Sequence, residues 1–167
     1  DYIASTVTHP GNIKKAESIA AWNENEKPAA VEEAIDKTSF DGAFGQVVCV
    51  GFDVEGAAYP STIFGMDESA VLKQLNESLR EALDPADLFT TTIVGHNVSA
   101  FDLRFLVQRY MVNGIRPHTV IARAAQAKPW ESDKVYDTMV QFAGVGNRIS
   151  LDKLCMALGL PGKDGIT

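Results

Sequence analysis

The sequence predicts an α/β fold, in which strands alternate with helices around a mixed sheet. Two segments rich in β-branched and apolar residues, 46–54 and 89–94, have the character of buried strands. Apolar residues at helical spacing follow each of them, beginning near Asp67 and near Ala100. A turn at Glu55 folds the first strand back on a second one, so the predicted sheet is not purely parallel.

The first forty residues are the most polar part of the chain and predict a helical hairpin. The pattern favours one helix over residues 12–22 and another over 28–35. Pro28 suits the first turn of the second helix, where its missing N–H costs nothing. Because the hairpin carries few large apolar residues, we expect it on the surface.

A β-hairpin and a helix follow. The strand over 46–54 is expected to be buried on both faces, and its partner strand ends near residues 59–60. The next helix opens at Asp67 and ends at Asp84-Pro85. Its predicted apolar face consists of Leu72, Leu75, Leu79 and Leu83.

The C-terminal half predicts two further helices. The first spans 100–112 and ends at Asn113-Gly114, with segment 135–142 forming a short strand or turn after it. The second begins at Ser150 as N-cap and stops at Gly159. The expected buried faces are Leu103, Leu106, Val107, Tyr110 and Met111 in the first, and Leu151, Leu154, Cys155 and Leu158 in the second.

Composition narrows the class of protein. The chain has 167 residues, 46% apolar and 22% charged, which fits one globular domain spanning 1–167. No stretch reaches the roughly 18 consecutive apolar residues of a membrane span. The net charge of −7 argues against a wholly basic nucleic-acid clamp. Cys49 and Cys155 lie in separate apolar segments and are expected to be buried free thiols of a cytoplasmic protein.

The segment Gly95–Leu106 carries the strongest chemical signal. It leads from the end of a predicted strand directly into a helix, at the sheet edge where α/β proteins bind ligands. The Asp102 carboxylate in the first helical turn could hold a hard cation such as Mg²⁺. The Asn97 amide and the Phe101 ring nearby could hydrogen-bond to and stack on a nucleotide.

The same spacing fits an ordinary helix start. Ser99-x-x-Asp102 has Ser99 in the place of an N-cap and Asp102 at the third helical position. A carboxylate there stabilises the helix through its dipole. Spacing alone leaves both interpretations open.

The motif from Asn97 to Asp102 resembles the second motif of the DEDD, or DnaQ-like, 3′–5′ exonucleases. The resemblance is strongest to the branch related to the proofreading domain of family B DNA polymerases. It extends over nearly the whole chain through residues 13–19, 44–49, 136–139 and 149–160, the last followed by Lys163.

This resemblance implies a ribonuclease H-like three-layer sandwich with a mixed sheet. It also implies hydrolysis of nucleotides from the 3′ end of single-stranded DNA, or less readily RNA, with two Mg²⁺ or Mn²⁺ ions. By resemblance Asp102 is a catalytic metal ligand, and Asn97 and Phe101 contact the terminal nucleotide. His96 adjoins this motif and could also reach the substrate. The alternative is a catalytically inactive module of the same fold that binds nucleic acid or a protein partner.

The chain departs from the family pattern in two places. The first motif, an Asp-x-Glu on a central strand, is expected upstream of Asp1, and the third, a Tyr or His followed by the last Asp on a helix, beyond Thr167. The chain is therefore expected to lack one strand and one helix of the domain and to be inactive by itself. Asp53-Val-Glu55 could mimic the first motif, but a solvated strand end explains it better.

The other polar residues are weaker indicators of a functional site. Asp137 is expected to be a structural group beside the site, and His96 could equally fill the end of its strand. His9 and His118 have no metal-ligand spacing. The basic residues that could form a phosphate-facing rim, if they are not simply solvated, are Arg104, Arg109 and Lys163.

Overall fold

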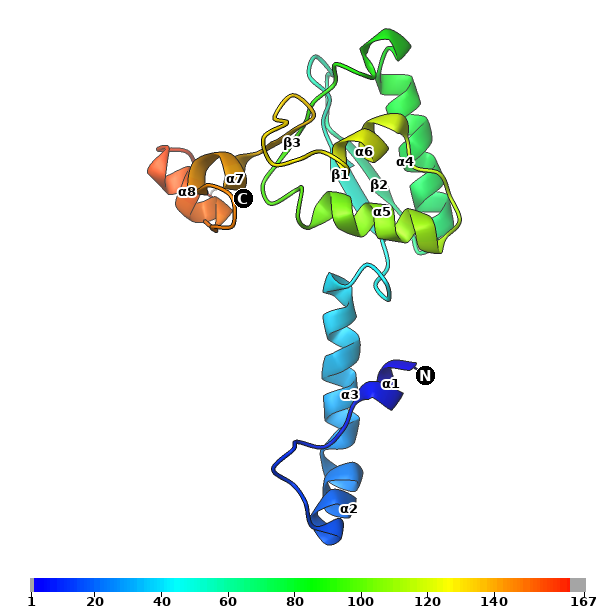
Figure 1. Cartoon of the computed structure of the whole chain (residues 1–167). Helices are drawn as coiled ribbons and strands as arrows, with labels where there is room; N and C mark the ends of the chain where they lie inside the picture. Colours follow the sequence, from blue (N-terminus) through cyan, green and yellow to red (C-terminus); the bar gives the residue numbers. More distant parts are fainter. Residues whose placement is uncertain (1, 163–167) are drawn as a thin grey trace. The chain divides into compact units, whose positions relative to one another are not determined.

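The computed structural model describes residues 2–162, so Lys163 lies outside the described residues. The chain divides into two compact units, Asp1–Gln46 and Val47–Thr167, coloured blue to cyan and cyan to red in Figure 1. We refer to them as the first and the second unit. The first contains α1 (Tyr2–Thr6), α2 (Ala16–Asn25), α3 (Lys27–Asp36) and a 3₁₀ turn, η1 (Lys37–Phe40).

The predicted helical hairpin in the first unit is confirmed, with shifted boundaries. Helices α2 and α3 replace the predicted 12–22 and 28–35, and Pro28 lies in the first turn of α3 as expected. Trp22 is 5% exposed, and its ring meets the His9 ring edge-on at 6.4 Å. The hairpin thus buries one large aromatic side chain and leaves its other helical positions mostly solvated.

The second unit contains two pairs of strands. β1 (Cys49–Phe52) pairs antiparallel with β2 (Ser61–Phe64), and β3 (Ile93–Gly95) pairs parallel with β4 (Val135–Asp137). The α/β class with mixed strand directions is confirmed. The three-layer ribonuclease H-like sandwich stays a prediction, because the described strands form two separate two-stranded sheets.

The strands are shorter than the sequence predicts. The expectation of a strand over 46–54 buried on both faces is wrong: β1 covers four residues and alternates between exposed and half-buried positions. Its partner begins at Ser61 instead of ending near 59–60. The third strand begins at Ile93, because Thr90 and Thr91 donate main-chain hydrogen bonds to Asp87 and keep the chain in a turn.

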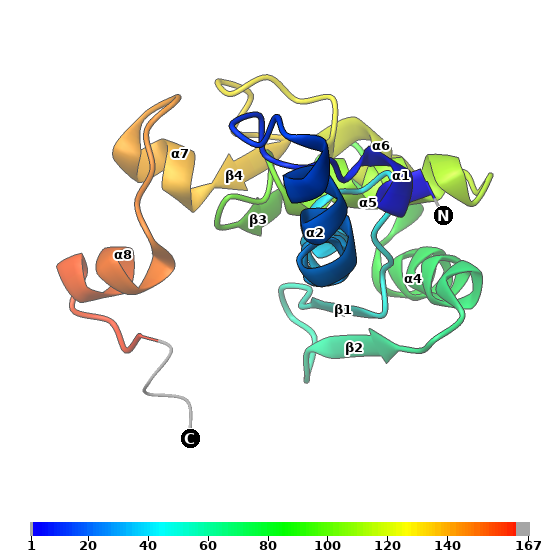
Figure 2. The same ribbon diagram turned by 90° about the horizontal axis from the view of Figure 1, so that it is seen from below.

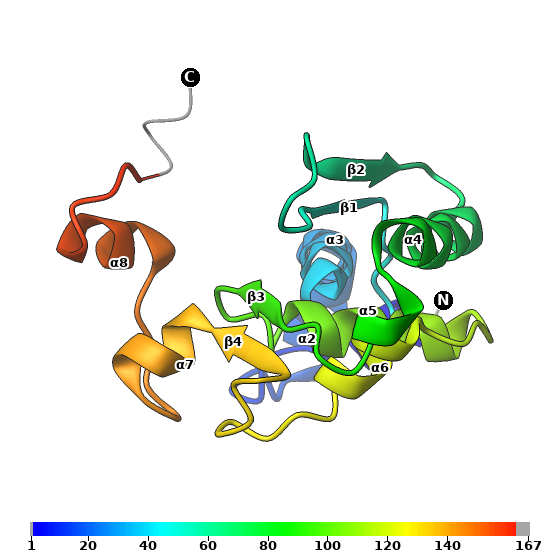
Figure 3. The same ribbon diagram turned by 90° about the horizontal axis from the view of Figure 1, so that it is seen from above.

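The helices of the second unit are α4 (Glu68–Ala82), α5 (Asp102–Val112), α6 (Thr119–Ala124), α7 (Thr138–Ala143) and α8 (Leu151–Ala157), with the 3₁₀ turn η2 (Pro85–Asp87). Figures 2 and 3 show α4 beside the β1–β2 pair and α7 continuing directly from β4. The sequence did not predict α6, and the strand or turn predicted over 135–142 is correct only for β4, since α7 occupies the rest. Ser150 caps α8 as predicted, because its Oγ accepts the Lys153 N–H at 3.2 Å.

One apolar core joins the two strand pairs to α4, α5 and α6. Leu72 and Tyr110 are fully buried at its centre. The other buried members are Val47, Ile63, Val71, Leu75, Val98, Leu103, Ile121, Ala124 and Val135. Part of the predicted pattern is wrong, since Met111 is exposed on α5. Leu154 is buried on α8, but Leu151 at its start and Leu158 just after its end are exposed.

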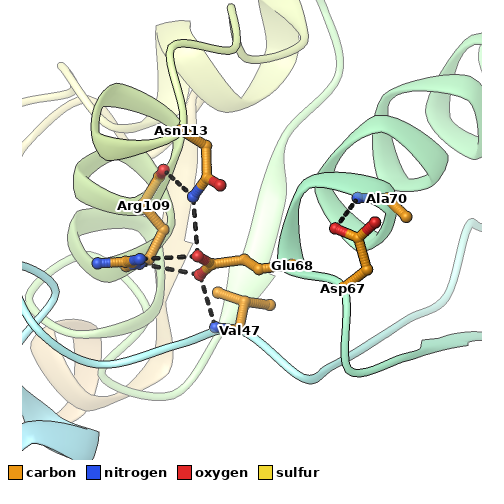
Figure 4. Close-up of polar contacts among 6 residues, drawn as sticks. All are labelled: Val47, Asp67, Glu68, Ala70, Arg109 and Asn113. Carbon is orange, nitrogen blue, oxygen red and sulfur yellow. Dashed lines mark hydrogen bonds and ion pairs between the residues drawn. The ribbon is translucent and has the colours of Figure 1, made fainter.

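A buried ion pair joins α4 to α5 (Figure 4). Arg109 Nε and Nη2 donate to the two oxygens of Glu68 at 2.8 and 2.7 Å. The same carboxylate accepts the Val47 N–H at 2.7 Å and the Asn113 side-chain amide at 2.8 Å. Neither interpretation of Arg109, as a phosphate-facing or a solvated residue, is correct, because this side chain is buried in the pair.

Two further observations concern exposure. Cys49 is exposed and Cys155 half-buried, so the expectation of two buried thiols is wrong. Cys49 is exposed because it occupies an outward position of the short β1. Within residues 2–162, no helix has both the length and the apolar character that crossing a membrane requires.

Candidate active site

The turn between β3 and α5 is built around a glycine and a left-handed asparagine. A Cβ at Gly95 would lie 2.7 Å from the Val98 Cβ, so only glycine allows this close approach. Asn97 has φ 59°, a conformation that asparagine tolerates better than most residues. From there the main chain turns helically, with the Phe101 N–H donating to the Asn97 carbonyl at 3.0 Å.

Asp137 fixes this turn from the neighbouring strand. Its Oδ1 accepts the Asn97 N–H at 2.9 Å and the Met139 N–H at 3.1 Å, and its Oδ2 accepts the Ser99 N–H at 3.1 Å. The side chain is only 3% exposed. This agrees with the structural role predicted for Asp137, since both oxygens satisfy main-chain donors.

Asp102 is the first residue of α5 and is exposed. The cap position belongs to Phe101, and no side chain caps the helix. The expectation of Ser99 as N-cap with Asp102 at the third position is therefore wrong. No other described residue hydrogen-bonds to the Asp102 carboxylate, and its own main-chain N–H is the group that interacts with it.

The surroundings of Asp102 disfavour its charged form. Although the residue is exposed, neighbouring protein atoms partly desolvate the carboxylate, and this desolvation raises its pKa. The negative charge of Asp137 raises the pKa further, while the main-chain N–H of Asp102 lowers it. A carboxylate with a raised pKa, and with no cation among residues 2–162 paired to it, is a candidate functional group.

His96 holds the segment that precedes α8. Its Nε2 lies 2.9 Å from the Ile149 carbonyl oxygen, and its Nδ1 lies 3.0 Å from the Thr138 hydroxyl. Because a carbonyl oxygen only accepts hydrogen bonds, Nε2 carries a proton here. His96 thus fills the end of its strand, and its contact with substrate stays a prediction.

A family model matches residues 45–167 of this chain. It describes a predicted 3′–5′ exonuclease related to the exonuclease domain of PolB. The chain belongs to this exonuclease family. The match covers the β3–α5 turn, Asp137 and α8. No curated protein matches the chain, and no solved structure matches it either.

A hollow of about 470 Å³ adjoins the turn between β3 and α5. His96 and Asn97 form one side of it, and Arg148, Ile149 and Ser150 form another. The sequence did not single out Arg148, whose neighbour Ile149 is hydrogen-bonded to His96 from 53 residues away. Phe101 stays partly exposed, with its ring 6.1 Å from that of Phe105.

The carboxylates of residues 2–162 do not complete a metal centre. No group of three or more histidine, cysteine or acidic side chains in this range could hold an ion. Asp102 offers one carboxylate free of other residues, whereas both oxygens of Asp137 are already used. Asp53 is exposed and accepts the Val54 N–H at 2.9 Å, as expected of a solvated strand end.

Proposed function

We propose that this chain is part of a metal-dependent 3′–5′ exonuclease that removes nucleotides from the 3′ end of single-stranded DNA. Asp102 is one of the acidic residues that hold Mg²⁺ or Mn²⁺. The observation that carries the proposal is that the Asp102 carboxylate, at the start of α5, receives no hydrogen bond from another described residue. Membership of the exonuclease family supplies the reaction class.

Two carboxylates at the turn have separate tasks. Asp137 orients the main chain of Asn97 and Ser99, so the turn is rigid before any ligand arrives. Because the turn is rigid, Asp102 at the start of α5 has a fixed position relative to β3. Its raised pKa reflects an electrostatic cost that a bound cation would relieve.

The proposed metal site requires further acidic ligands, which residues 2–162 do not gather around Asp102. A ribonuclease H-like sandwich would place the first of them on a strand between β1 and β3. The register leaves the main-chain groups of Cys49 and Gly51 in β1, and of Val94 in β3, on edges that have no partner strand among the described residues. Those edges are suited to pair with such a strand.

Residues of the β3–α5 turn and of the hollow beside it bind the substrate. Bound metal ions would activate a water and stabilise the leaving oxygen. Asn97 and Phe101 contact the terminal nucleotide through an amide and an aromatic face. Arg148, which lines the hollow with Asn97, provides a cation for the phosphate backbone.

The test is cleavage of a 3′-labelled single-stranded oligonucleotide by the full-length protein with Mg²⁺ or Mn²⁺. Asp102→Asn should lower the rate at least about a hundredfold, because loss of even an outer partner of a metal ligand costs 10–100-fold. Asp53→Asn removes an exposed carboxylate of the same type and should leave the rate unchanged. Equal rates for Asp102→Asn and the unmodified protein would refute the proposal, and binding of DNA without cleavage would indicate the inactive module instead.

A further inference from the structure

A second pocket, of about 600 Å³, lies between the end of α4 and the loop that leads into α6. Its polar wall includes Arg80, Arg116 and His118, and its apolar wall includes Leu83 and Leu88. Among the described residues no carboxylate lines it. It shares no lining residue with the hollow beside Asn97.

The loop over 116–119, which lines one side of this pocket, is hydrogen-bonded to Asn76 of α4. The Asn76 Oδ1 accepts the His118 N–H at 2.8 Å, and its Nδ2 donates to the Arg116 carbonyl at 2.9 Å. The buried Tyr110 hydroxyl lies 2.9 Å from the same Oδ1. Because Asn76 and Tyr110 are themselves buried, the loop is held in place without any ligand.

His118 offers the pocket a hydrogen-bond donor. The residue is 7% exposed, and its Nδ1 accepts the Val120 N–H at 3.4 Å. The proton of the neutral ring is therefore on Nε2. Nε2 forms no hydrogen bond with any described residue, although the ring lines the pocket.

The two arginines add positive charge at the rim. No described residue pairs with the Arg116 guanidinium. Arg80 lies 2.5 Å from the Glu77 carboxylate, but both side chains are exposed. Exposed ion pairs of this kind contribute little free energy, so an anion can compete with Glu77 for Arg80.

We propose that this pocket binds the phosphate group of a nucleotide or of a nucleic-acid strand. Arg80 and Arg116 pair with the phosphate charge, and His118 Nε2–H donates to one of its oxygens. The apolar wall of Leu83 and Leu88 packs against the attached sugar or base. On a chain of net charge −7, a pocket lined by cations and donors is a local exception that attracts anions. The assignment does not depend on the function of Asp102.

The test is an NMR titration of the full chain with inorganic phosphate at constant ionic strength. We expect saturable shifts of the side-chain N–H signals of Arg80, Arg116 and His118. Arg116→Gln, at an exposed position, should weaken binding at least about tenfold, as expected for one charge-assisted hydrogen bond. Lys73→Gln removes one positive charge from the exposed side of α4 and should leave binding unchanged.

Two further ligands identify the source of the phosphate. Tighter binding of a deoxynucleoside monophosphate than of a single-stranded oligonucleotide indicates a free nucleotide, and the reverse order indicates a strand. The proposal is overturned if sodium chloride of equal ionic strength produces the same shifts. It is equally overturned if Arg116→Gln binds phosphate as tightly as the unmodified chain.

Discussion

The Asp137 carboxylate lies 2.9 Å from the main-chain nitrogen of Asn97, forty residues earlier in the chain. This contact joins the end of β4 to the turn that leads into α5. It explains how two neighbouring acidic residues acquire different chemistry. The Asp137 carboxylate accepts hydrogen bonds from main-chain N–H groups, whereas the Asp102 carboxylate accepts none from another described residue and can bind a ligand.

Asp137→Asn should destabilise the second unit by about 2 kcal/mol, because an amide cannot accept all three main-chain hydrogen bonds and places an N–H against a donor. Urea unfolding measures the change, and hydrogen exchange at Asn97 and Ser99 should accelerate. Asp133→Asn, at an exposed position in the same region, is the matched control and should change stability by less than about 0.5 kcal/mol. Equal stability of both variants would contradict this role for Asp137.

Gly95→Ala should cost about 1–3 kcal/mol, because the new Cβ would lie 2.7 Å from Val98 and the turn must open. Gly51→Ala is the control, since a Cβ at Gly51 meets nothing within 4 Å. Thermal unfolding compares the two variants. If the two variants have the same melting temperature, the close approach of Gly95 to Val98 does not determine the conformation of the turn.

Asp102→Asn should leave the metal-free chain as stable as the unmodified one at pH 7, or more stable. The folded-state pKa of Asp102 is raised, so folding disfavours its charged form, and removing the charge removes that cost above the pKa. Urea unfolding without divalent ions measures the effect. A loss of about 0.3–1 kcal/mol would instead show that the charged carboxylate stabilises the N-terminus of α5 through the helix dipole.

Glu68→Gln should destabilise the second unit by about 3–5 kcal/mol, because it leaves the buried Arg109 guanidinium without its counter-charge. The exposed Glu77→Gln should change stability by less than about 1 kcal/mol. Urea unfolding of both variants at pH 7 separates a buried pair from an exposed one.

The stability contributed by Glu68 should also depend on pH. Hydrogen bonding from Arg109 lowers its pKa to about 2 from an ordinary value of 4.5. Its contribution is therefore complete above about pH 4.5 and is lost as the pH falls toward 2. The stability difference between the unmodified chain and Glu68→Gln should narrow across this range. A difference that is constant from pH 6 to pH 2.5 would contradict the lowered pKa.

Local patterns in the sequence were enough to predict several elements. Apolar spacing located α4 and α5, and the serine before an apolar run located the start of α8. The end of a strand followed by Gly95-His-Asn97 located the turn that the structure confirms. These features depend on neighbouring residues, which a single sequence displays directly.

Long-range polar contacts could not be predicted in the same way. The partner of Arg109 is 41 residues away, and no periodicity identifies Glu68 as that partner. Arg109 lies three residues after Leu106, beside the apolar stripe, but this position fits a solvated arginine as well as a buried and paired one. The His96 contact with Ile149, which brings Arg148 to the hollow, spans 53 residues and left no comparable signal.

The most direct test of the central claim is paramagnetic broadening by Mn²⁺ in the full-length protein. If Asp102 holds a divalent cation, Mn²⁺ should broaden the main-chain amide signals of Phe101, Asp102 and Leu103, and Mg²⁺ should compete it away. Asp102→Asn should abolish the broadening, and Asp53→Asn should preserve it. Broadening that is absent from these three amides, or that persists in Asp102→Asn, would contradict the account.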